Sequence, residues 1–134
     1  MIRQIESNTA PKPLSSYAQA IEIPPGQRVV HVSGQVGVTM SGEVPADPAR
    51  QHDLAWENAM AILAAAGMDH RNIVDAHVYI TDRAHLALYR QTRDRFLKGH
   101  KPAATLLIVA GLADERLVVE VDLVAAAEAA APAT

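Results

Sequence analysis

Hydrophobic residues recur at two different spacings along this chain, and the spacings predict strands in some segments and helices in others. In residues 73–81 nearly every second side chain is aliphatic, and Asp75, His77 and Tyr79 stand between them. This period of two predicts a β-strand with one buried face. In residues 55–66 the apolar side chains recur three and four positions apart, which predicts a helix that packs along one side.

Residues that favour helix ends mark where the helices begin and stop. Asp47-Pro48 can start the first helix, because the aspartate side chain accepts free backbone N–H groups and proline fits the first helical position. Gly67 is a natural end for it. Asp82 can start a second helix, which ends near Lys98-Gly99. Further apolar runs that favour strands lie at residues 2–5, 17–23, 28–33, 105–109 and 117–125.

The order of these elements predicts an α+β domain. Strands, a helix, a strand, a helix and further strands follow one another, and right-handed connections place both helices on one face of a sheet. The opposite face then carries His77, Tyr79, Glu120 and Asp122 among aliphatic residues. On a chain of this length a half-polar face indicates packing between subunits. We expect one domain over residues 1–126 and a C-terminal tail over residues 127–134.

Composition and charge then narrow the classes of function. The 134 residues are 49% hydrophobic, which suits one folded core rather than a disordered chain. The net charge is −3 and basic residues alternate with acidic ones, so we expect no nucleic-acid partner. Without cysteine there is no thiol nucleophile or thiolate metal site. No apolar run reaches the roughly 20 residues of a membrane helix. We therefore expect a cytoplasmic protein without a membrane partner.

The six histidines do not form a metal-binding motif. No two of them are two or four positions apart, as in short zinc motifs, so we expect no metal. His31 and His77 lie within predicted strands and are candidates for a site, with a purely structural role as the alternative. Most of the other histidines are expected at the surface. The six positions are 31, 52, 70, 77, 85 and 100.

Three further residues could carry chemistry, and each has a simpler alternative. Glu120 lies in a valine-rich strand, where a carboxylate could move protons or aim a water molecule; alternatively, Glu120 and Asp122 mark a solvated strand face. Ser33 precedes Gly34 at the end of a predicted strand. Because no Gly-x-Ser-x-Gly elbow is present, Ser33 is a hydrogen-bonding group or a turn residue rather than a nucleophile. Tyr17 is either a core residue or a pocket wall.

Several short segments match a known family in order and spacing. They include Tyr-Ala-Gln at 17–19, Val-Ser-Gly-Gln at 32–35, Gly-Glu-Val-Pro-Ala-Asp at 42–47, Pro-Ala at 102–103 and Val-Glu-Val at 119–121. Together they resemble the Rid family of imine and enamine deaminases, also called YjgF/YER057c/UK114. The resemblance implies a chorismate-mutase-like α+β fold (bacillus type), with two helices on one face of a mixed sheet. It also implies a homotrimer around a closed barrel, with small-molecule ligands in clefts between subunits and no cofactor or metal.

The resemblance assigns roles to individual residues. It places Tyr17 in the cleft wall, Ser33 near the amino end of the substrate, and Glu120 where it positions the attacking water. Position 104 is the one departure that matters, because the family's deaminases have a carboxylate-binding arginine where this chain has Ala104. The expected site therefore comprises catalytic Tyr17, Ser33 and Glu120, and substrate contacts from His31, Ala104, Thr105 and Leu106.

The missing arginine puts the substrate in question. Leaving an anion unpaired in a partly desolvated cleft typically costs about 2–5 kcal/mol. Another cation could replace the arginine, with Arg28, Arg71 or His31 as candidates. Alternatively the ligand has no carboxylate there, and a wider apolar pocket lies beside Tyr17, Met40 and Ala104.

Two functions stay open at this point. The first is a Rid-like enamine or imine deaminase, or a related small-molecule enzyme, whose substrate is not anchored by the usual arginine. The alternative is a non-catalytic Rid-like trimer that binds a metabolite or a protein partner.

Overall fold

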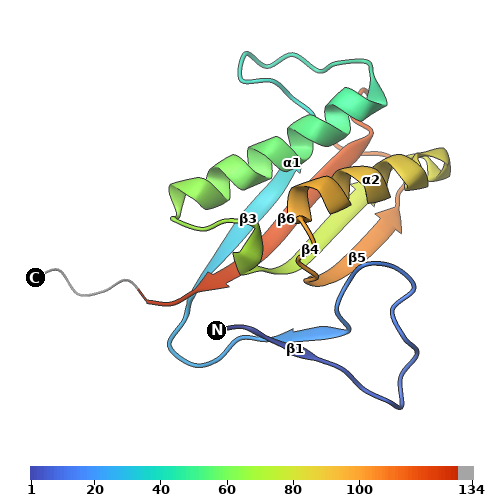
Figure 1. The fold of residues 1–134 in the computed structure, drawn as a ribbon. Helices are drawn as coiled ribbons and strands as arrows, with labels where there is room; N and C mark the ends of the chain where they lie inside the picture. The colour runs from blue at the N-terminus through green and yellow to red at the C-terminus, as the bar shows by residue number, and fades with distance from the viewer. Residues whose placement is uncertain (130–134) are drawn as a thin grey trace, which may run out of the picture.

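Two helices lie across one face of a four-stranded sheet (Figure 1). The strand order is β3-β6-β4-β5, with β6 antiparallel to both of its neighbours and β4 parallel to β5. This computed structural model describes residues 1–129 and confirms an α+β fold with a mixed sheet. The elements are β3 (Arg28–Val36), α1 (Pro48–Ala65), β4 (Ile73–Ile80), α2 (Leu86–Leu97), β5 (Ala103–Ile108) and β6 (Val119–Ala127). Residues 130–134 of the expected tail lie outside the described part.

The first strands form a separate small hairpin, β1 (Arg3–Ile5) with β2 (Ala20–Glu22). The loop between them reaches the start of β5 (Figure 1). There the Ala18 N–H donates to the Pro102 carbonyl at 2.9 Å, and the Gln4 amide donates to the Lys101 carbonyl at 3.1 Å. These bonds hold the predicted cleft residue of this loop, Tyr17, beside the main sheet.

Helix boundaries follow the capping chemistry of the sequence. The Asp47 carboxylate accepts the Ala49 N–H at 3.1 Å, and Pro48 opens α1 as predicted. The prediction that Asp82 caps the start of the second helix is right about the capping, but it places the start of α2 too early. Asp82 caps a short 3₁₀ turn, Arg83–His85, and α2 begins only after it. The left-handed Lys98, with φ of 51°, then ends α2 before Gly99.

The core lies between the sheet and the helices. The aliphatic face of β4 is buried under them, as its alternation predicted, and Trp56 of α1 stacks on Phe96 of α2 at 6.0 Å between ring centroids. The expectation that most of the remaining histidines are surface residues does not hold for His52. Its ring is fully buried, edge-on to His85, and burial together with the nearby His85 lowers the pKa of His52 to about 4.

Several strand boundaries differ from the prediction: β2 covers residues 20–22 rather than 17–23, and β5 covers residues 103–108 rather than 105–109. Strand β3 continues to Val36, so Ser33 and Gly34 lie inside a strand rather than at its end. Strand β6 begins at Val119 rather than Leu117. Leu117 belongs to the preceding turn, because its N–H donates to the Asp114 carbonyl at 3.0 Å. Within residues 1–129 no helix is long and apolar enough to cross a membrane.

Candidate functional site

The sheet face turned away from the helices carries the predicted polar residues. In the register of the sheet, Tyr79 of β4 lies opposite Glu120 of β6, and His77 lies opposite Asp122. These side chains are only partly buried, whereas their neighbours along each strand are buried in the core. The alternation therefore confirms the predicted half-polar face.

Glu120 lies against a β-bulge in β3. The pairing of β3 with β6 shifts between Val32 and Gln35, so that Ser33 and Gly34 together form an irregular step in the ladder. A Cβ atom built on Gly34 would lie 1.8 Å from Oε2 of Glu120. The carboxylate thus occupies the space that a side chain at position 34 would need. An exposed serine stands next to it.

This position of Glu120 suits a carboxylate that transfers protons to or from a small-molecule ligand. Because residue 34 is a glycine, the Glu120 carboxylate lies directly against the β3 backbone there. The preceding residue, Ser33, is exposed. A carboxylate in such a position can accept a proton from a water molecule, and a hydroxyl can orient a polar ligand. His31 is also exposed, two residues earlier on the same strand.

His77 belongs to an ionic network on the same face. Its Nδ1 lies 2.8 Å from Oδ1 of Asp122 and its Nε2 lies 2.8 Å from Oδ2 of Asp75. The Tyr79 hydroxyl donates to the other Asp122 oxygen at 2.9 Å. Burial acts to lower the pKa of His77, but the hydrogen bond to Asp122 and the charges of both aspartates outweigh it, so the pKa is raised above 6.5. The contacts of His77 therefore support the alternative of a purely structural role.

This network predicts a pH-dependent contribution to stability. Because folding raises the pKa of His77, its contribution is fully present below the unfolded value of 6.5 and is lost as pH rises through the folded value. We expect the stability advantage of the wild type over His77→Gln, measured by urea unfolding at one protein concentration, to be larger at about pH 6 than at about pH 9. An advantage that does not change with pH, or that grows as pH rises, would contradict a charged His77.

A second group of predicted residues lies elsewhere, in a hollow beside α2. About 280 Å³ is enclosed there, and the lining includes Tyr17, Ala104 and Leu106. The hydroxyl of Tyr17 accepts the Leu14 N–H at 3.1 Å, which fixes the ring in the wall of the hollow. Tyr17 also lines a larger neighbouring hollow of about 540 Å³ inside the β1–β2 loop. Tyr17 is therefore part of the wall of both hollows.

One copy of the chain does not bring the two groups together. In the β4–β5 register, Ala104 and Leu106 lie opposite Ala76 and Val78, whose side chains face the helices. Thr105 lies opposite His77 and so faces the other way. The sheet therefore separates Glu120, Ser33, Thr105 and His31 on its open face from Tyr17, Ala104 and Leu106 beside α2.

Within one copy of the chain, the suggested replacements for the missing arginine do not line the hollow at Ala104. Arg28 donates to the carbonyls of Ala66 and Glu128, and Arg71 pairs with Asp69 at 2.7 Å. Neither residue lines the hollow, and nor does His31. Met40, expected beside Ala104, is instead fully exposed on the loop after β3.

The hollow contains two arginines that sequence reasoning missed, Arg90 and Arg93 of α2. Their spacing of three placed them on one side of a predicted helix. No local pattern indicated, however, that the loop before β2 folds back against this part of α2. That contact is made by the Arg93 guanidinium, which donates to the Ser15 hydroxyl at 3.1 Å.

Known proteins share both the sequence and the fold of this chain. The profile of a family described as Endoribonuclease L-PSP matches residues 7–127. The chain is 33% identical over 116 residues to the 2-iminobutanoate/2-iminopropanoate deaminase of Escherichia coli (strain K12), which covers 84% of this chain and 88% of that protein. It is 28% identical over 120 residues to Protein DfrA of Myxococcus xanthus, which covers 82% of this chain and 85% of that protein.

A solved structure supports the same assignment. A protein of unknown function of the Rid family, YyfB from Yersinia pestis, superposes with a TM-score of 0.82 at 25% sequence identity, covering 92% of this chain and 97% of that one. The profile match spans far more than half of the chain, and the motifs that suggested the family lie within it. The chain therefore belongs to the Endoribonuclease L-PSP family, known also as the Rid or YjgF/YER057c/UK114 family.

Proposed function

We propose that this protein is a deaminase that hydrolyses small imines or enamines. One observation carries the proposal: the Glu120 carboxylate lies directly on the Gly34 backbone, next to the exposed Ser33. A family relative of 33% identity is named a 2-iminobutanoate/2-iminopropanoate deaminase, which supports this chemistry.

The reaction needs water and proton transfer only. Glu120 accepts a proton from a water molecule as its oxygen adds to the imine carbon. The same carboxylate returns the proton to the nitrogen, which gives a carbinolamine. Glu120 then takes the proton of the new hydroxyl group and passes it to the nitrogen as the carbon–nitrogen bond breaks, so the products are a carbonyl compound and ammonia. Ser33 orients the nitrogen end of the ligand, and Tyr17 closes the cleft around it. We propose no metal or cofactor in this reaction.

The complete site requires a second copy of the chain. Because Tyr17 and Glu120 lie on opposite sides of one sheet, a ligand can touch both only where the hollow of one copy meets the open face of another. That open face includes exposed aliphatic side chains at Val29 and Leu107, 45% and 49% exposed, which suit burial between subunits. We propose a homotrimer with a small-molecule cleft at each interface.

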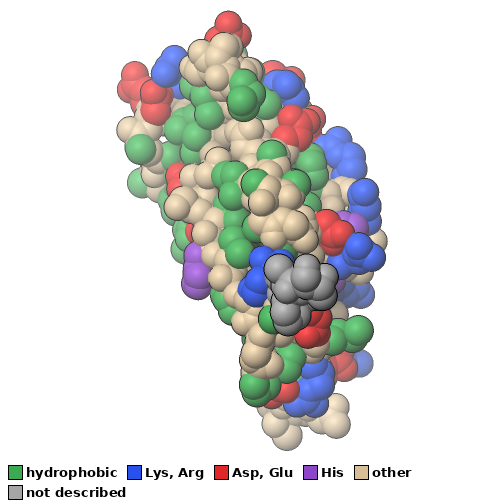
Figure 2. Space-filling model, turned by 90° about the vertical axis from the view of Figure 1, so that its left-hand side faces the viewer, with side chains coloured by type: hydrophobic (Ala, Val, Ile, Leu, Met, Phe, Trp, Pro, Cys, Tyr) green, Lys and Arg blue, Asp and Glu red, His purple; other side chains and the backbone are tan. Residues whose placement is uncertain are grey.

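The charge distribution argues against a nucleic-acid substrate in spite of the family's description. The net charge is −3, so phosphate neutralisation has little support. On the face drawn in Figure 2, basic and acidic side chains are interspersed and hydrophobic ones lie between them.

Turnover tests the proposal directly. Imines made in situ by an amino-acid oxidase or a pyridoxal-phosphate dehydratase should lose ammonia faster in the presence of the purified protein, and light scattering should report a trimer. Ligand-dependent melting without any ammonia release would instead favour the non-catalytic alternative and overturn the proposed activity.

Substitution of Gly34 should lower the activity and leave the stability of the fold unchanged. In Gly34→Ala the new Cβ would fall 1.8 Å from Oε2 of Glu120, so the carboxylate must move. The end of a flexible side chain moves at little cost, and we expect the urea midpoint to stay close to that of the wild type while turnover falls about tenfold or more. The matched control is Gly111→Ala, where nothing lies within 4 Å. Full activity in Gly34→Ala would place the reacting water elsewhere.

A further inference from the structure

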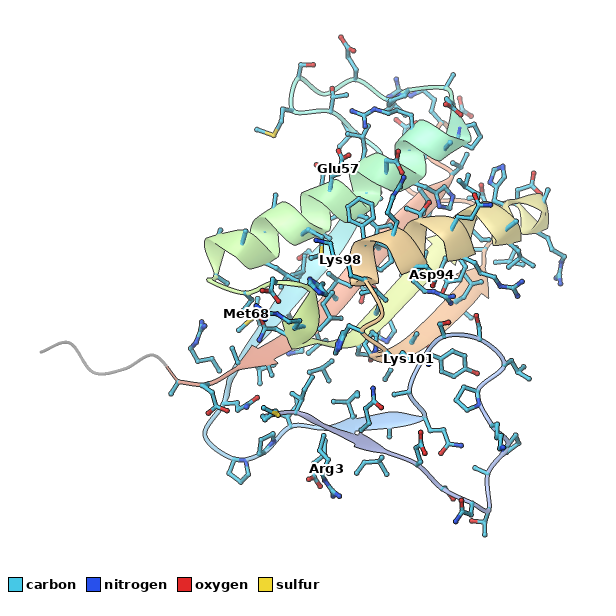
Figure 3. The ribbon with its side chains drawn as sticks, viewed as in Figure 1. Arg3, Glu57, Met68, Asp94, Lys98 and Lys101 are labelled. Carbon is cyan, nitrogen blue, oxygen red and sulfur yellow. The ribbon has the colours of Figure 1, made fainter. Side chains whose placement is uncertain are left out.

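Two arginines of α2 line the hollow that contains Ala104. Arg90 and Arg93 are three positions apart, so their side chains leave the helix on the same side. Figure 3 labels Asp94 on α2 and Lys101 just before β5. Helix α2 and strand β5 both supply residues to the lining of this hollow. Ala104, a residue with a small side chain, lines the same hollow as the two arginines.

Arg93 is held in a fixed orientation. The residue is only 3% exposed; its Nε donates to Oδ1 of Asp94 at 3.0 Å, and its Nη2 donates to the Ser15 hydroxyl at 3.1 Å. The guanidinium also lies 5.2 Å from the centre of the Tyr89 ring. Within residues 1–129 its remaining nitrogen, Nη1, has no protein hydrogen-bond partner, and it is not one of the fully buried unpaired atoms, so it keeps access to solvent. A buried guanidinium with unused N–H groups beside a hollow is suited to a ligand acceptor.

Arg90 adds a second positive charge at the rim. It is exposed and forms no ion pair with any other residue of the described part of the chain. Among the lining residues there is no carboxylate, and Asp94 lies outside the hollow and offsets only one of the two charges. Two like charges beside one small space repel each other, and an anion between them removes that repulsion.

We infer that Arg90 and Arg93 bind the carboxylate of the ligand from the helix side, in place of an arginine at position 104. A guanidinium presents N–H groups in one plane, which matches a carboxylate. Ala104 and Leu106 supply an apolar floor for the small body of the ligand. The substrate class is therefore 2-imino acids rather than neutral imines. The substrate class rests on the proposed function, whereas carboxylate binding can be measured without turnover.

Binding of a product-like acid tests this site. 2-Oxobutanoate is titrated into the wild type, Arg90→Gln, Arg93→Lys and the control Arg95→Gln, whose arginine pairs with Asp53 outside the hollow. We expect affinity to fall about tenfold or more in the first two variants and to stay unchanged in the control. The neutral amide of the same acid should bind all four proteins equally weakly. Arg90 is exposed, so its variant should fold, and Arg93→Lys keeps the buried charge while removing the planar group.

A double variant distinguishes loss of the site from loss of structure. Ala104→Arg in the Arg90→Gln background places a guanidinium back in the same hollow and should restore affinity for 2-oxobutanoate. Wild-type affinity in both Arg90→Gln and Arg93→Lys, or equal binding of acid and amide by the wild type, would overturn the inference. If the acid binds in an Arg90-dependent way but no imine is hydrolysed, the proposed function fails and this carboxylate site stands.

Discussion

Replacing Glu120 with glutamine is expected to reduce kcat for imine hydrolysis about 10²- to 10⁴-fold, the usual contribution of a positioned acid–base group. Glutamine keeps the size of the side chain and its position on Gly34, but an amide does not accept the proton of an attacking water. The substrate contacts that we propose for Arg90 and Arg93 of α2 are untouched, so KM should change little. Ammonia release and ketoacid formation, measured together from imines generated in situ, give both constants.

Asp122→Asn is the matched control for Glu120→Gln. Asp122 lies two residues along the same strand, on the same face, and its carboxylate contacts His77 and Tyr79. Its loss should weaken that network and lower stability, while kcat stays within a few-fold of the wild type. Equal loss of activity in both variants would mean that the negative charge of the open face, or assembly through it, matters rather than proton transfer by Glu120. Light scattering on both proteins separates these cases.

Most of the fold could be predicted because local chemistry and tertiary packing agree. Alternation in residues 73–81 gave β4 with the right buried face, and Asp47-Pro48 gave the start of α1. The predicted end of β3 at Ser33 was wrong for a physical reason. Ser33-Gly34 has the composition of a turn, but here it forms a bulge inside β3, because β6 continues to pair on both sides of it.

The site was only partly predictable from the sequence, because its geometry depends on contacts between distant segments. Glu120 could be singled out as a charge in a valine-rich strand, and family resemblance supplied its partner Ser33. Which face Ala104 occupies follows from the register with β4, and its arginine neighbours follow from the packing of α2 on β5. Which strand pairs with β5 and which helix packs over it depend on segments distant in the chain. A local pattern therefore did not show that Arg90 and Arg93, rather than Arg28 and Arg71, line the hollow of their own chain.

The close approach of β3 to α1 depends on glycine at position 37. A Cβ atom built there would lie 2.5 Å from Cβ and 2.6 Å from Cα of Gln51. Gln51 is 1% exposed and bonds three backbone groups: its Nε2 donates to the carbonyls of Pro45 and Arg116, both at 2.8 Å, and its Oε1 accepts the Val118 N–H at 2.9 Å. Backbone as well as side chain would therefore have to move to admit a methyl group.

Gly37→Ala is consequently expected to destabilise the protein by about 3 kcal/mol, the upper part of the usual range for overpacking, because the clash reaches a backbone atom. Loosening Gln51 adds to the cost, since each buried backbone group left without its partner costs about 1–3 kcal/mol. Urea unfolding should show the lower midpoint with an unchanged slope. Gly111→Ala, with no neighbour within 4 Å, is the matched control and should unfold like the wild type. A Gly37→Ala protein as stable as this control would mean that α1 can shift away from β3 without breaking the Gln51 bonds, and the helix would not be fixed where the structure places it.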